Sequence, residues 1–570
     1  MYFRKLTVPA LQRQTVEVFT GFDRRKRAGA GTLAQAENLS LEQYPALTVR
    51  RGRGTVTRLA QGGGMTDKET LIWVDGTTLY VGGLATQLVL RRGEKQFVSM
   101  GAYLVIFPDK VWINLRDLSQ FGHLDHTVTA QGEVAFSLCR GDGTPWGEYT
   151  AAPEAPLQAA DGALWLDLSG TSPVLRRCSG QLWEEAADVC VKLQSGGIGA
   201  GFRAGDGVTV SGCEAENLNG LHVLRAVSDD TLIFSGTVAG DSVHSGGVTV
   251  SRSVPEMDFV TECGNRLWGC KYGVVNGRAV NEIYASKLGD FCNWNCYAGL
   301  STDSYAVSRG SDGPFTAAAS YLGSVLFFKE NCIERLYPNA SGAHSVVTLE
   351  CSGVGRGSHK SVAAVDGTLY YLSRDGVCAF DGSLPRPVSA ALEGMGLHSG
   401  VAGAWQGSYY LSAEGTEGHH LLVYDARRGL WQRQDALAVQ DFACWEGELY
   451  ALTADGTVLA LHGQVGEAEE PVSWLAETGE LHLTAAEQRY PVRLTLRLQL
   501  PRGSQVQAAL SHDGGKTWQP QGAIRGGGDS AVTFHLRPRR SASLRLRLTG
   551  QGECTLYAIS AVYGKGSDET

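Results

Sequence analysis

Three phrases that recur at one spacing decide the fold: VDGTLYYL at 365–372, WQGSYYL at 405–411 and WEGELYAL at 445–452. Their glycines occupy positions 367, 407 and 447, which is a period of 40 residues. Each phrase is a glycine turn followed by a run of apolar and aromatic residues, the pattern of a strand that leaves a hairpin. Since a period of about 40 residues with several strands per unit is typical of a β-propeller, we expect that fold here.

Four further phrases of the same kind precede these three. They are VDGTTLYV at 74–81, MGAYLVIF at 100–107, CGNRLWGC at 263–270 and YLGSVLFF at 321–328. Together the seven phrases predict an all-β chain with a propeller of about seven blades. A long stretch without this phrase separates the copy at 100–107 from the copy at 263–270. We therefore expect a first part of the propeller at 54–150 and a second part at 256–470.

Two of the remaining segments are expected to be additions to the propeller. Residues 1–53 predict an N-terminal extended arm. Residues 151–255 predict an inserted small β-barrel or β-sandwich, because short strand patterns at 222–227 and 231–234 follow glycine-rich turns. Such insertions are tolerated at loop tips.

Residues 471–570 form a third addition. The run at 493–500 alternates strictly between apolar residues and polar or charged ones, as in an antiparallel sheet with one solvated face. We therefore expect a separate C-terminal β-sandwich. Helix is expected to be scarce, with short candidates at 33–42 and 184–193.

Composition excludes several classes of protein. The formal net charge is −9, which argues against a protein that wraps nucleic acid. The 13 cysteines contain no CxxC pair and no matching histidine set, so we expect buried free thiols, a reducing compartment, no metal and no cofactor. A signal peptide and a run of about 18 apolar residues are both missing from the sequence, so we expect no membrane span.

Two basic clusters lie in the expected arm, and each can be interpreted in two ways. The residues are Arg24, Arg25, Lys26, Arg27, Arg50, Arg51 and Arg53. Such a cluster is either a solvated turn or a contact with an acidic partner or nucleic-acid phosphate.

One motif resembles the Asp-box turn of sialidases and of many non-enzymatic propellers. It is S-x-D-x-G-x-x-W, formed by Ser511, Asp513, Gly515 and Trp518. The aspartate is expected to accept backbone N–H groups, the glycine to supply an unusual dihedral and the tryptophan to pack beneath the turn. A sialidase needs several such turns, an arginine cluster and a tyrosine nucleophile, so we interpret this single copy as structural.

No catalytic set emerges from the sequence, and we expect no enzymatic activity. A glycosidase needs two carboxylates roughly 5–10 Å apart, and nothing selects a pair among the loop aspartates. These are Asp290, Asp303, Asp312, Asp375 and Asp381. Several tryptophans either line a sugar site or belong to the blade cores. They are Trp268, Trp294, Trp405, Trp431 and Trp445.

Residues 258–395 resemble β-propeller virion proteins of tailed bacteriophages and prophages, particularly those of Gram-positive hosts. The matching phrases are NRLWGC at 265–270, IYASKLGD at 283–290, STDSY at 301–305 and LFFKEN at 326–331. The unit at 205–238, the N-terminal Asn38-Leu39-Ser40 and Tyr44-Pro45, and the ending at 539–568 are also similar to those proteins.

The resemblance implies a structural tail component without catalysis: a hub, nozzle or adaptor that forms a ring around the DNA channel. A hexamer is favoured. The implied partners are other tail and connector proteins, with passing contact to double-stranded DNA during ejection. The implied location is the virion tail, after synthesis in the host cytoplasm.

Two other functions stay open from the residues themselves. The first alternative is a receptor-binding tail protein that recognises cell-surface glycan, favoured by the aromatic residues and by the sandwich, a common lectin architecture. The second is a depolymerase or sialidase-like hydrolase, favoured only by the Asp-box and the propeller.

Overall fold

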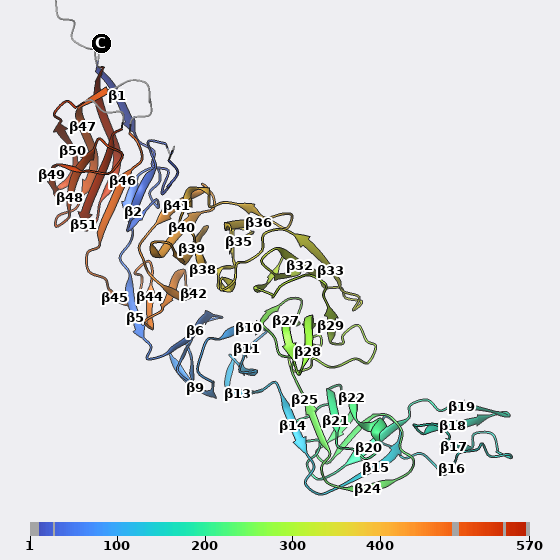
Figure 1. The fold of residues 1–570 in the computed structure, drawn as a ribbon. Helices are drawn as coiled ribbons and strands as arrows, with labels where there is room; N and C mark the ends of the chain where they lie inside the picture. The colour runs from blue at the N-terminus through green and yellow to red at the C-terminus, as the bar shows by residue number, and fades with distance from the viewer. Residues whose placement is uncertain (1–10, 27–28, 482–488, 540–542, 566–570) are drawn as a thin grey trace, which may run out of the picture. The chain divides into compact units, whose positions relative to one another are not determined.

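The computed structural model describes residues 11–26, 29–481, 489–539 and 543–565. The protein is all-β, and its helices within the described residues are the single turns η1 (Glu216–Leu218), η2 (His359–Ser361) and η3 (Ala390–Leu392) (Figure 1). The chain divides into two compact units. Unit 1 comprises the described parts of 1–94, 328–333 and 349–570, and unit 2 comprises 95–327 and 334–348.

The repeated phrases form four-stranded antiparallel sheets whose strands follow one another in chain order. The first two sheets contain β6 (Gly62–Asp67), β7 (Leu71–Asp75), β8 (Thr78–Val81) and β9 (Leu84–Val89), and then β10 (Gln96–Met100), β11 (Tyr103–Phe107), β12 (Val111–Asn114) and β13 (Asp117–His123). The next two contain β26 (Phe259–Glu262), β27 (Leu267–Val275), β28 (Arg278–Ala285) and β29 (Tyr305–Ser308), and then β30 (Ala317–Tyr321), β31 (Ser324–Phe328), β32 (Cys332–Tyr337) and β33 (Ser345–Glu350). The last two contain β34 (Ala363–Val365), β35 (Thr368–Ser373), β36 (Gly376–Phe380) and β37 (Arg386–Pro387), and then β38 (His398–Trp405), β39 (Ser408–Gly415), β40 (Gly418–Asp425) and β41 (Leu430–Arg433).

A further sheet combines strands from distant parts of the sequence. β42 (Val439–Trp445), β43 (Glu448–Thr453) and β44 (Thr457–Ala460) are followed in the sheet by β5 (Gly54–Arg58) and β45 (Glu467–Ala468). Arg58 lies opposite Thr457 in this pairing. The last repeat therefore obtains its fourth strand from the residues that precede the first repeat.

The turn glycines explain why the repeats are visible in the sequence. Gly407 has φ +78°, and the preceding Gln406 has φ +44°. Two central residues with positive φ define the type I′ turn, whose twist matches that of paired strands. Gly367 and Gly447 occupy the same position before β35 and β43. Gly76 differs, because it lies between the second and third strands of its sheet.

The first strands of successive sheets pack beside one another. In unit 1, β34 neighbours β38, β38 neighbours β42, and β42 neighbours β6; in unit 2, β10 neighbours β26, and β26 neighbours β30. This packing covers second strands on both faces, most completely in β31 and β43, in which every residue is buried. Four of the five tryptophans expected to form blade cores are buried, and Trp445 is partly buried.

The structure differs from the expectation of an N-terminal extended arm. Residues 11–49 contribute strands to a two-layered C-terminal sandwich, with β1 on β52 and β2 on β46. One sheet runs β3-β4-β52-β47-β50, and the other β2-β46-β51-β48-β49. The strands are β1 (Leu11–Val16), β2 (Leu33–Glu37), β3 (Leu39–Ser40), β4 (Leu47–Val49), β46 (Ser473–Thr478), β47 (Arg489–Leu500), β48 (Gln505–Ser511), β49 (Gln519–Arg525), β50 (Gly528–His535), β51 (Arg545–Gln551) and β52 (Thr555–Lys565).

The predicted helix at 33–42 is wrong for an identifiable reason. This segment forms β2 and β3, and the pairing of β2 shifts register between Leu33 and Gln35. The shift places both Leu33 and Ala36 in the core. An apolar spacing of three residues therefore imitates a helical pattern.

The inserted domain begins earlier than predicted. It extends from β14 (His126–Thr129) to β25 (Thr249–Arg252), which pair with each other, whereas the expected start was residue 151 (Figure 1). Its larger sheet also contains β15 (Glu133–Cys139), β20 (Cys190–Gln194), β21 (Gly207–Ser211), β22 (Gly220–Ser228), β23 (Thr231–Ser235) and β24 (Ser242–Ser245). A smaller sheet contains β16 (Tyr149–Ala152), β17 (Leu164–Asp167), β18 (Val174–Ser179) and β19 (Leu182–Glu185), so the helix predicted at 184–193 is also wrong.

Candidate functional site

Two of the arginines expected to contact a partner are buried in ion pairs of the chain itself. Arg50 Nη1 lies 2.8 Å from Glu469 Oε2, and Arg53 Nη1 lies 2.7 Å from Asp435 Oδ2. Both arginines are buried. Their guanidinium groups fasten the segment before β5 and are not available to phosphate.

The other basic residues are more exposed. Arg24 pairs with Glu417 at 2.8 Å, Arg25 with Asp23 at 2.6 Å, and Arg51 with Glu42 at 2.9 Å. Lys26 is exposed. Arg27 lies outside the described residues.

The Asp-box forms the turn between β48 and β49. Asp513 Oδ1 accepts the backbone N–H groups of Lys516 (3.0 Å) and Thr517 (2.9 Å), and Ser511 Oγ accepts that of Gly515 (2.8 Å). Hydrogen bonds from the Thr517 hydroxyl and backbone hold the pKa of Asp513 below its usual range. Trp518 lies under the guanidinium of Arg547, 3.9 Å from its carbon. These contacts give the motif a structural role in the hairpin.

Three of the loop aspartates also serve their own loops. Asp290 accepts the backbone N–H of Cys292, Asp303 those of Ala298 and Leu300, and Asp381 that of Ser383. Hydrogen bonds of this kind stabilise turns.

A cluster of charged side chains surrounds the buried Asp441, between η2 and the start of β42. Lys360 Nζ is 2.8 Å from Glu94 Oε1 and 2.7 Å from Asp441 Oδ1, and His359 is 3.4 Å from Glu94. Burial raises the pKa of Asp441 to about 6, whereas the hydrogen bonds from His359 and Lys360 lower the pKa of Glu94 to about 2. Asp441 also accepts the backbone N–H of Met65. The cluster thus ties four segments of unit 1 together: β6, the residues after β9, η2 and β42.

A pocket of about 610 Å³ lies in unit 2 where the inserted domain joins the sheet of β10–β13. One wall is aromatic, with Tyr103, Trp112 and Phe291 in mutual contact. The other wall carries Asp206 and Arg252, which form an ion pair of 2.7 Å.

A set of hydrogen bonds around Asn293, which we call the polar latch, lies beneath this pocket and holds the inserted domain to the loop that follows β28. Asn293 is 1% exposed, and its amide nitrogen donates to Asp206 (2.9 Å) and Asp290 (2.6 Å). Its amide oxygen accepts the backbone N–H of Gly207 at 3.0 Å. A Cβ atom at Gly207 would lie 2.2 Å from the carbonyl oxygen of Asn295, so the two loops approach closely.

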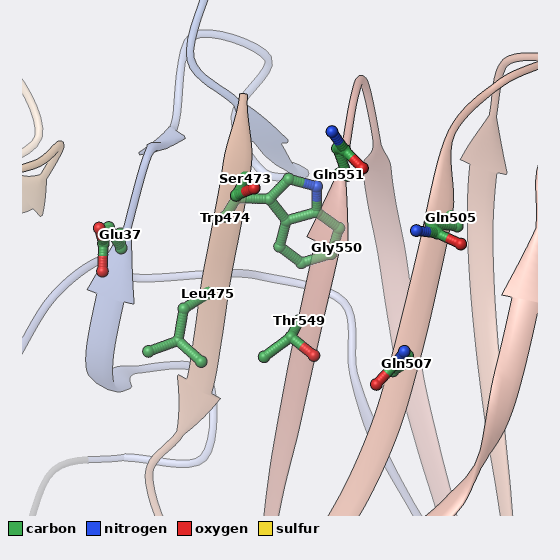
Figure 2. A pocket seen from close by; sticks show the side chains of 9 residues that line it. All are labelled: Glu37, Ser473, Trp474, Leu475, Gln505, Gln507, Thr549, Gly550 and Gln551. Carbon is green, nitrogen blue, oxygen red and sulfur yellow. The ribbon is translucent and has the colours of Figure 1, made fainter. Parts of the chain in front are cut away.

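The outer face of the second sandwich sheet contains a groove of about 380 Å³, shown in Figure 2. We call it the amide groove. It is lined by Glu37, Ser473, Trp474, Leu475, Gln505, Gln507, Thr549, Gly550 and Gln551. The sequence did not predict this site, because its residues come from four strands and carry no motif. The alternating exposed glutamines of β48 were the available signal.

The side chains and helices of the described residues also bear on three other features: a metal site, disulfide bonds and a membrane span. The described residues contain no group of three or more His, Cys, Asp or Glu side chains placed to hold a metal ion. None of the 13 cysteines, all of which lie in the described part of the chain, forms a disulfide bond, and most are buried. No helix in the described part of the chain has the length and apolar character required to cross a membrane.

Comparison with known proteins gives no family assignment. No family model and no curated protein matches the chain. Among solved structures, an exo-β-1,3-galactanase from Phanerochaete chrysosporium is 11% identical, with a TM-score of 0.21 over 53% of this chain and 94% of its own. The GH43 protein BlXynB from Bacillus licheniformis is 9% identical, with a TM-score of 0.21 over 54% of this chain and 97% of its own. These likenesses are too weak to carry an argument about activity.

Proposed function

We propose that the chain is a structural component of a phage tail, of the hub, nozzle or adaptor kind, located in the virion. The sequence supports this through the resemblance of residues 258–395 to propeller virion proteins. The packing of the first strands of neighbouring sheets also supports the proposal, because β42 of the last repeat packs on β6 of the first repeat. We infer from the seven repeated phrases that the chain has about seven propeller blades.

The observation that carries the proposal is a set of exposed apolar side chains on outer strands and added parts. Leu84 and Val89 are 67% and 75% exposed on β9, which ends its sheet, and Val274 is 72% exposed near the end of β27. Leu157 and Leu182 of the insert are also largely exposed. Exposed apolar groups along unpaired strand edges are typical of surfaces that meet other proteins.

The partners in this proposal are further copies of the chain and neighbouring tail proteins, with a hexameric ring favoured. The charges support passing contact with DNA instead of tight binding. The net charge is −9, and each described arginine of the two basic clusters already has a carboxylate partner. Tight binding of phosphate requires cationic groups that are free to replace counterions.

Native mass spectrometry and electron cryo-microscopy of the purified full-length protein test the proposal. We expect a closed ring for the wild type and for the control Gln87→Glu, which adds a charge at an exposed polar position of β9. Leu84→Glu combined with Val89→Glu should reduce the number of subunits. A protein that stays monomeric with its purified tail neighbours, and is absent from phage particles, would overturn it.

A further inference from the structure

We propose that the amide groove is a binding site for a neutral, hydroxyl-rich chain, that is, a segment of glycan. This inference goes beyond the proposed structural role and does not depend on ring formation. It also places glycan recognition on the sandwich and not on the tryptophans of the repeats, most of which are buried.

The register of three strands creates a grid of hydrogen-bonding groups. Ser473, Gln551 and Gln505 lie opposite one another across β46, β51 and β48, and Thr549 and Gln507 form the next row on this face (Figure 2). Neighbouring strands lie about 4.8 Å apart, and residues i and i+2 about 7 Å apart, so the grid has the scale of a short oligosaccharide.

Other described parts of the chain do not use the hydrogen-bonding groups of the grid. Four of these side chains lie along the groove in Figure 2: Gln505, Gln507, Gln551 and Thr549. None of the four forms a side-chain hydrogen bond with any described residue. A glutamine amide both donates and accepts, which suits hydroxyl groups that do the same. Glu37 is the one charged residue among those that line the groove, which favours a neutral ligand over a polyanion.

The same sheet face provides an internal comparison in the next two rows. There Arg547 pairs with Glu477 at 2.8 Å and covers Trp518, and Arg545 pairs with Glu480 at 2.8 Å. In that part of the face the arginine side chains are thus paired with carboxylates in β46 or just after it. The amides of the groove differ from these arginines, because they form no hydrogen bond with a charged side chain of the described residues.

The floor of the groove is rigid. Trp474 is buried beside Gly550, and its indole nitrogen donates to the carbonyl oxygen of Gly552 at 3.0 Å. A Cβ atom at position 550 would lie 2.3 Å from the indole ring, so glycine leaves the space that the ring fills. A fixed floor lowers the entropic cost of binding for the groups above it.

The test uses the fluorescently labelled full-length protein on an array of neutral and acidic glycans, followed by calorimetry with the best soluble neutral oligosaccharide. We expect binding to neutral glycans, weakened about tenfold or more by Gln505→Ala combined with Gln507→Ala, because two hydrogen bonds are lost. The control, Gln519→Ala combined with Gln521→Ala on β49, should bind like the wild type. Three results would overturn the proposal: absence of neutral glycan binding, binding of acidic probes alone, or equal affinity of the groove variant and the wild type. Thermal unfolding of each variant verifies that the sandwich is folded.

Discussion

The polar latch of the insert leads to a quantitative prediction for Asn293→Ala. The substitution removes three hydrogen bonds in a site that is 1% exposed, two to carboxylates and one from the backbone of Gly207. Bonds to charged groups contribute about 1.5–3 kcal/mol each, and a neutral bond contributes about 1 kcal/mol. Because Asp206 keeps its ion pair with Arg252, we expect a total loss of about 4 kcal/mol in the stability of this junction.

Hydrogen exchange followed by mass spectrometry is the appropriate assay, because the loss is local. Exchange should accelerate in 203–211 and 287–296 and stay unchanged in the sheets of unit 1. The matched control is Asn217→Ala, which removes one exposed hydrogen bond to Thr237 within the same domain and should cost about 1 kcal/mol or less. If both segments of Asn293→Ala exchange as slowly as those of the control, the latch does not hold the insert and the reasoning is refuted.

Three further predictions concern unit 1. Gly54→Ala should lower the unfolding free energy by about 2 kcal/mol in urea titrations, because its Cβ would lie 1.8 Å from the carbonyl oxygen of Val465; an unchanged midpoint contradicts this. Asp513→Ala should accelerate hydrogen exchange at Lys516 and Thr517, whose N–H groups it leaves unbonded, and unaltered protection would show that the carboxylate is dispensable. Burial raises the pKa of Asp441 from 3.8 to about 6, so its contribution to stability is full at low pH and is lost as the pH rises through 6. Urea titrations between pH 4 and 7 should show a loss of about 2–3 kcal/mol in the wild type that is missing in Asp441→Asn; parallel curves would exclude this role.

Local sequence patterns were sufficient to predict the hairpins of the repeated sheets. Glycines at the two-residue turns allow positive φ, and the apolar runs that follow them become strands covered on both faces. Both signals depend on neighbouring residues, so the sequence displays them directly. The phrase at 74–81 is the exception, because its glycine belongs to the turn between β7 and β8. A turn signal identifies a hairpin but not its place within a sheet.

The sequence by itself thus determined the all-β class, the repeat of about 40 residues and the alternating strands of the C-terminal sandwich. The pairing of strands that are far apart in the sequence required the tertiary structure. Arg58 and Thr457 are 399 residues apart, and β2 joins β46 over a similar span. An alternating pattern defines which face of a strand is buried, but it contains no information about the partner strand. The amide groove has the same origin, because Gln505, Gln551 and Ser473 become neighbours only when β48, β51 and β46 pair in this register.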